Sequence, residues 1–103
     1  MARKFIIQDD CLRVGNVEMH FELENAKNKN PVIGGGYWHI DNERTTLYLY
    51  GKSIDFGKIT MENLQRVKSK RTSAPSIQKL QWRWFDSDSL SDVLERGKNV
   101  MEK

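Results

Sequence analysis

The run GGGYWHIDNERTTLYLY, residues 34–50, decides the fold. Residues 37–40 and 45–50 are rich in aromatic and β-branched side chains, which favour strands. The polar residues 41–44 between them are typical of a turn. The run therefore predicts two antiparallel strands joined by a short turn.

Side chains along this hairpin separate into two faces, because successive residues of a strand point to opposite sides of the sheet. With an even-length loop we expect Trp38 to pair with Leu47. One face then carries Trp38, Ile40, Leu47 and Leu49. The other carries Tyr37, His39, Tyr48 and Tyr50.

The chain before residue 34 also has strand character. Residues 4–7 and 12–14 are short apolar runs, with Asp9-Asp10 as a turn between them and Gly15-Asn16 as a two-residue hairpin signal. Residues 17–24 show the clearest period of two in the chain, which predicts a strand with one buried and one exposed face. The Asn-rich residues 25–31 end in proline and predict a surface loop.

The pattern after Lys58 alternates between helix and strand. Thr60 is a candidate N-cap for a helix over residues 60–70, whose apolar stripe consists of Met61, Leu64 and Val67. A loop at 72–76 and a strand at 77–85 follow. Ser89, with Asp92 three residues later, resembles a capping box and predicts a helix over residues 89–101.

The order of these elements predicts one α+β domain over residues 1–103, with a mainly antiparallel sheet of about five strands and two helices, about 60–70 and 89–101. The composition of 38% hydrophobic and 30% charged residues is that of a folded globule. The expected core side chains are Phe21, Trp38, Leu49, Leu80, Trp82, Trp84 and Leu94.

Cysteine usage and the lack of long apolar runs bear on the compartment. Cys11 is the single cysteine, whereas small secreted domains usually carry several. The basic N-terminus has no long apolar region behind it, and no run approaches the ~20 residues of a membrane helix. We therefore expect a cytoplasmic protein that does not enter a membrane.

No catalytic or cofactor signature stands out. The glycines at 34–36 precede a strand, whereas phosphate-binding loops precede a helix and carry Gly-Lys-Ser/Thr, so a bulge or a close backbone approach is the simpler interpretation. Cys11 follows the acidic residues Asp9 and Asp10, and such surroundings are unfavourable for a nucleophilic cysteine. We expect no cofactor, and the sequence is more consistent with a non-enzymatic domain.

A metal-dependent protein or small enzyme remains an alternative. His39 and Asp41 lie two residues apart and would point the same way on a strand, and His20 would join them if its strand were a neighbour.

Aromatic and basic side chains give the first hypothesis, a binding or accessory domain that acts through a sheet face. Residues 1–57 carry seven Lys/Arg and eight Asp/Glu, whereas residues 58–103 carry ten and six. Sheet aromatics flanked by positive charge can stack bases and hold phosphates. The candidate binding residues are Tyr37, His39, Tyr48, Tyr50, Lys70, Arg71, Lys79 and Arg83. The partner could be a protein or a single-stranded nucleic acid, and a self-associating module is a further alternative.

Overall fold

The structure, a computed structural model, describes residues 2–25, 27, 30–67 and 71–101, the last three of these by their backbone alone. Its strands are β1 (Ala2–Gln8), β2 (Cys11–Val17), β3 (Val32–Asp41), β4 (Thr46–Tyr50) and β5 (Gln81–Phe85). Its α-helices are α1 (Met61–Gln65) and α2 (Leu90–Met101), and short 3₁₀ helices form at η1 (His20–Leu23) and η3 (Pro75–Ile77).

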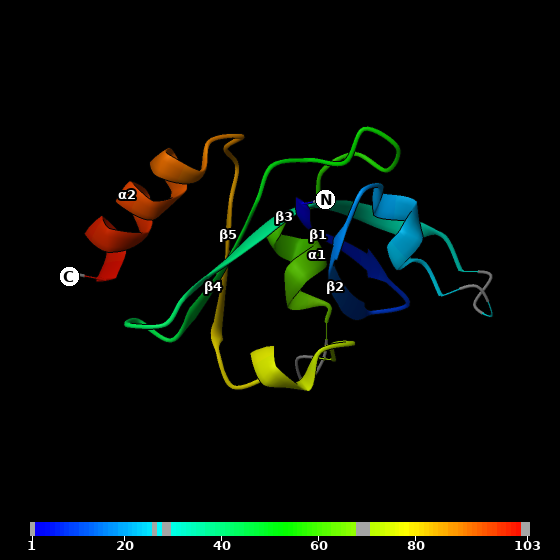
Figure 1. The fold of residues 1–103 in the computed structure, drawn as a ribbon, viewed down its shortest axis with the longest axis horizontal. Helices are drawn as coiled ribbons and strands as arrows, with labels where there is room; N and C mark the ends of the chain where they lie inside the picture. Colours follow the sequence, from blue (N-terminus) through cyan, green and yellow to red (C-terminus); the bar gives the residue numbers. More distant parts are fainter. Residues whose placement is uncertain (1, 26, 28–29, 68–70, 102–103) are drawn as a thin grey trace.

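All five strands belong to one sheet in the order β2-β1-β3-β4-β5. Every neighbouring pair is antiparallel except β4 and β5, which run parallel. The chain from β4 to β5 passes through α1 and η3, a crossover of the kind that parallel neighbours require (Figure 1). The predicted α+β class is thus confirmed, with one parallel pair in a mostly antiparallel sheet.

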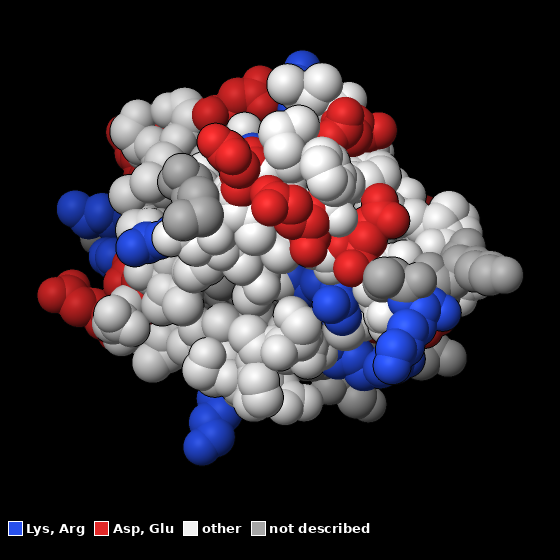
Figure 2. All heavy atoms as spheres, turned by 45° about the vertical axis from the view of Figure 1, so that its right-hand side comes forward, with Lys and Arg blue, Asp and Glu red and all other residues white. Residues whose placement is uncertain are grey.

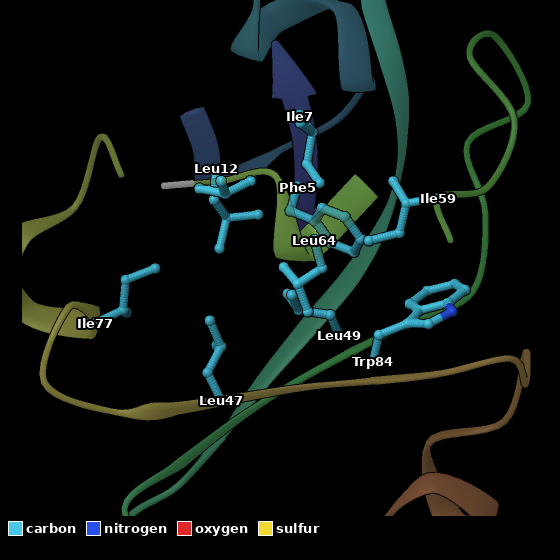
Figure 3. Packing of buried hydrophobic residues seen from close by; sticks show 10 residues of the cluster. Phe5, Ile7, Leu12, Leu47, Leu49, Ile59, Leu64, Ile77 and Trp84 are labelled. Atoms are coloured by element: carbon cyan, nitrogen blue, oxygen red, sulfur yellow. The ribbon is translucent and has the colours of Figure 1, made fainter. Parts of the chain in front are cut away.

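The main core lies on one face of the sheet, called here the core face. Side chains from three strands, Phe5 of β1, Leu47 and Leu49 of β4 and Trp84 of β5, pack against side chains of α1 and η3 (Figure 3). Trp38 and Ile40 pack at the edge of this cluster. The opposite face, called here the second face, is covered by η1 near β1 and by α2 near β4.

The β3–β4 hairpin has the predicted faces with a different register. Trp38 pairs with Leu49, not with Leu47, because four residues form the loop between Asp41 and Thr46. A shift of two residues keeps every side chain on its predicted face, since the period of a strand is two. The division of the hairpin side chains between two faces is therefore confirmed, although the pairing was wrong.

The strand predicted at 17–24 is wrong. The chain turns at Asp9-Asp10, where both residues have positive φ, and Gly15 and Asn16 continue β2 instead of forming a hairpin loop. Residues beyond Val17 leave the sheet, and His20–Leu23 form η1. Burial there differs from the expected pattern. His20, expected to be exposed, is 5% exposed, whereas Phe21, an expected core residue, is 53% exposed. Periodicity reports burial only where a neighbouring strand is present to pair with.

The helices begin where the capping residues predict. The Thr60 hydroxyl accepts the Asn63 N–H at 3.1 Å, and the Ser89 hydroxyl accepts the Asp92 N–H at 3.3 Å. α1 ends at Gln65, earlier than predicted, and the predicted residues 68–70 lie outside the described part of the chain. Similarly, the strand predicted from residue 77 begins only at Gln81, because Pro75–Ile77 forms a 3₁₀ turn.

The glycine run at 34–36 lies where the backbone is crowded. A Cβ at Gly35 would lie 2.5 Å from the backbone oxygen of Phe5 and 3.2 Å from the His20 ring, and one at Gly34 would lie 2.8 Å from the oxygen of Lys58. The close-approach interpretation of this run is therefore confirmed for the described residues.

Candidate binding site

Aromatic rings form a strip on the second face, between η1 and α2. The tyrosine strip is defined here as Tyr37, His39 and Tyr50, all half-buried. Tyr37 lies 5.8 Å from Tyr50 between ring centroids, and on its other side it meets the His20 ring of η1 edge-on at 5.7 Å. Three of the four hairpin residues predicted to bind therefore present part of their rings to solvent.

Tyr48, the fourth predicted hairpin residue, does not present its ring. It is fully buried beneath α2, where Gly97 packs against its ring, and it stacks on His39 at 6.5 Å between centroids. Burial raises the pKa of its hydroxyl, with a smaller contribution from Asp41. Tyr48 therefore packs beside His39 of the strip, and its ring is inaccessible to a ligand in this conformation.

A pocket of about 500 Å³, called here the hairpin pocket, opens between the β3–β4 hairpin and α2. His39 belongs to both the tyrosine strip and this pocket. The remaining lining residues are Ile40, Asp41, Asn42, Glu43 and Arg44 of the hairpin and Leu94, Glu95 and Lys98 of α2.

Two of the residues that line the hairpin pocket form an ion pair. Arg44 Nη1 donates to Asp41 Oδ2 at 3.1 Å, and the Arg44 backbone N–H donates to Asp41 Oδ1 at 3.2 Å. Burial alone would raise the pKa of the Asp41 carboxyl, but the hydrogen bonds from Arg44 outweigh it and hold that pKa below its ordinary value. The ion pair thus links Asp41, at the end of β3, to Arg44 in the four-residue loop, and the Asp41 carboxylate stays charged.

Of the predicted basic residues that the structure describes, only Arg83 lies beside a tyrosine of the hairpin. Arg71 lies against β2, where its carbonyl accepts the Leu12 N–H at 2.9 Å, and two strands separate β2 from β4. Lys79 is exposed in the turn before β5. Arg83 pairs with Tyr48 across β4 and β5 and is half-buried, and Lys70 lies outside the described residues.

Charges of both signs occur on the surface near η1. Figure 2 shows acidic side chains grouped across the upper part of that face and basic side chains grouped below them. The hairpin pocket is mixed as well, since Arg44 and Lys98 face it together with Asp41, Glu43 and Glu95. Neither surface has the single positive sign that a polyanion requires.

Each of the alternative metal ligands contacts another group in the structure. The buried His20 ring has its Nε2 2.8 Å from the Gly36 oxygen, His39 stacks on Tyr48, and Asp41 holds Arg44. Among the described residues, no group of three or more His, Cys, Asp or Glu side chains is placed to hold a metal ion.

Sequence reasoning missed the contribution of α2 to the site. Glu95 and Lys98 lie on its polar side, three residues apart, and resemble any solvated helix face in the sequence. Only the packing of Gly97 against Tyr48 brings them beside the hairpin. Arg44 was assigned to a turn, and the signal that could have identified its role is the Asp41–Arg44 spacing of three residues.

Comparisons of the chain with protein-family models, with curated proteins and with solved structures find no match. None of the described helices combines the length and the apolar character needed to cross a membrane.

Proposed function

We propose that this protein is a small non-enzymatic binding domain that docks a protein partner on the tyrosine strip and the hairpin pocket. The observation that carries the proposal is that His39 joins the two, so half-exposed aromatic rings continue into a pocket of about 500 Å³. Tyrosine supplies apolar contact area with a polar end at a low entropic cost, and it is enriched at protein interfaces for that reason.

The mixed charge of the pocket favours a polypeptide over a nucleic acid. Nucleic-acid binding depends on several Lys and Arg side chains that contact phosphates together. Here the acidic side chains Asp41, Glu43 and Glu95 share the pocket with two cations, while Arg71 lies at the far edge of the sheet. A polypeptide offers both signs of charge and apolar side chains, which matches this lining.

Selection of a displayed library of random peptides against the purified protein tests the proposal. We expect enriched peptides to bind with a modest salt dependence and to lose about tenfold in affinity, or ~1.4 kcal/mol, in both Tyr50→Ser and Arg44→Glu. Ser76→Ala on η3, remote from both surfaces, is the matched control and is expected to bind as the wild type does.

Titration of labelled single-stranded DNA and RNA at two salt concentrations tests the nucleic-acid alternative. We expect no binding at micromolar protein. Micromolar binding that weakens steeply with salt and is lost in Tyr50→Ser would contradict the protein-partner proposal and favour a nucleic acid. Peptides that bind both site variants as well as the wild type would place the docking surface elsewhere.

A further inference from the structure

The two edges of the sheet differ in how they are covered. Along β2, residues 71–73 pair with the edge: Leu12 N–H donates to the Arg71 oxygen at 2.9 Å, and Ser73 N–H donates to the Leu12 oxygen at 3.1 Å. β5 forms the other edge, and no segment among the described residues pairs with its outer side. An uncovered edge is a template for another strand.

The backbone N–H and C=O groups of β5 that point away from β4 belong to Trp82 and Trp84. Gln81 N–H donates to the Thr45 oxygen at 2.9 Å, which directs the backbone polar groups of Gln81, and by alternation those of Arg83 and Phe85, towards β4. The N–H and C=O groups of Trp82 and Trp84 therefore point away from the sheet.

The charges at the two ends of β5 are opposite in sign. Exposed Lys79 precedes the strand, whereas exposed Asp86 and Asp88 follow it. Asp86 is bound to Lys58 at 3.2 Å, but Asp88 has no ion-pair partner among the residues that the structure describes. If the β5 of a second copy ran antiparallel to the first, its acidic end would lie beside the basic end of the first. The two-fold symmetry would repeat this contact at the other end of the strand pair.

From this complementarity we propose that the β5 edge binds the β5 edge of a second copy of this chain, forming one continuous sheet across a two-fold axis. In the register that sets Trp84 opposite Trp84 of the other copy, the backbone N–H and C=O groups of the two Trp84 residues hydrogen-bond to each other. It also places Arg83 opposite Phe85, whereas a register centred on Arg83 would set two like charges directly across from each other.

Apolar surface beside the β5 edge would further stabilise the dimer. A groove of about 360 Å³ lies between α1 and β5, lined by Met61, Leu64, Val67, Trp82 and two glutamines. Met61 is 50% exposed and Trp82 is half-buried. In the paired arrangement the grooves of both copies flank the axis on the core-face side, where association removes apolar area from water.

Sedimentation velocity over a concentration series, combined with NMR hydrogen exchange, tests the pairing. We expect a concentration-dependent dimer in which the Trp82 and Trp84 amides become protected as the dimer forms. A chain that stays monomeric at millimolar concentration, or a dimer whose Trp82 and Trp84 amides stay unprotected, overturns the proposal.

A charge swap tests the orientation of the two strands. Lys79→Glu and Asp88→Lys are each expected to weaken the dimer about tenfold, and a mixture of the two variants is expected to regain wild-type affinity as a heterodimer. Both residues are exposed, so circular dichroism should confirm folded variants. If the mixture dimerises no more tightly than either variant alone, the antiparallel arrangement is overturned. Tyr50→Ser, on the tyrosine strip, is the control and should dimerise normally, which keeps this test separate from that of the proposed function.

Discussion

Gly97 of α2 lies directly against the ring of Tyr48 on β4. A Cβ at residue 97 would lie 2.6 Å from Tyr48 Cε1 and 2.7 Å from its hydroxyl oxygen, which is closer than real Cβ atoms come to a neighbour. The ring cannot easily retreat, because it is fully buried between His39 and Phe85, at centroid distances of 6.5 and 6.0 Å. This contact sets how closely the helix approaches the sheet.

Gly97→Ala is therefore expected to destabilise the fold in spite of its better helix propensity. Replacing a helical glycine contributes ~1 kcal/mol, whereas overpacking a buried contact costs ~1–3 kcal/mol. We expect a net loss of about 1 kcal/mol in the free energy of unfolding, measured in urea. Arg96→Ala, on the exposed side of the same helix, should change this free energy by less than ~0.5 kcal/mol. A stabilised Gly97→Ala variant would show that α2 does not rest on Tyr48.

Tyr48→Phe is expected to leave stability unchanged or to raise it by up to ~1 kcal/mol. The Tyr48 hydroxyl is buried and finds no hydrogen-bond partner among the described residues, so its removal deletes a desolvated polar group and no bond. Urea unfolding of Tyr48→Phe and wild type measures the difference. A loss above ~1 kcal/mol would reveal a partner for the hydroxyl.

The fold is expected to lose stability as the pH falls below about 6.5, because of His20. Burial is the largest influence on this ring and lowers its pKa; the bond to the Gly36 oxygen raises it, Lys4 lowers it and Asp55 raises it, and the net pKa lies below the ordinary 6.5. The unfolded chain therefore takes up the proton first, so stability is lost from pH ~6.5 down to the folded pKa.

Urea unfolding between pH ~5 and ~8 measures this dependence. In His20→Gln, whose amide can donate to the Gly36 oxygen without titrating, the loss of stability at the acidic end should be smaller than in the wild type. Equal pH dependence in both proteins would show that His20 does not cause it.

Trp84→Ala and Phe21→Ala are expected to differ sharply. Trp84 is 9% exposed in the core cluster, and its truncation should cost ~3–5 kcal/mol. Phe21 is 53% exposed on η1, and its truncation should cost less than ~1 kcal/mol. Chemical denaturation of both variants checks the contrast. A cost for Phe21→Ala close to that for Trp84→Ala would show that Phe21 is packed more tightly than its exposure indicates.

Local sequence signals predicted those features that depend on near neighbours in the chain. The caps at Thr60 and Ser89 were predicted because a cap bonds an N–H three residues away. The two faces of the β3–β4 hairpin followed from the period of its strands, and they survived a shift of two residues in the pairing.

Tertiary structure decided which chain segments meet. The alternating pattern of residues 17–24 specified a strand, but only part of it found a neighbour to pair with, and the rest became η1 over the glycines of β3. Packing of α2 buried Tyr48 and formed the hairpin pocket, while the path of residues 71–80 carried Arg71 away from the tyrosines. A period or a cap is encoded within a few residues, whereas the burial of a side chain depends on segments distant in sequence, whose placement follows from the packing of the whole chain.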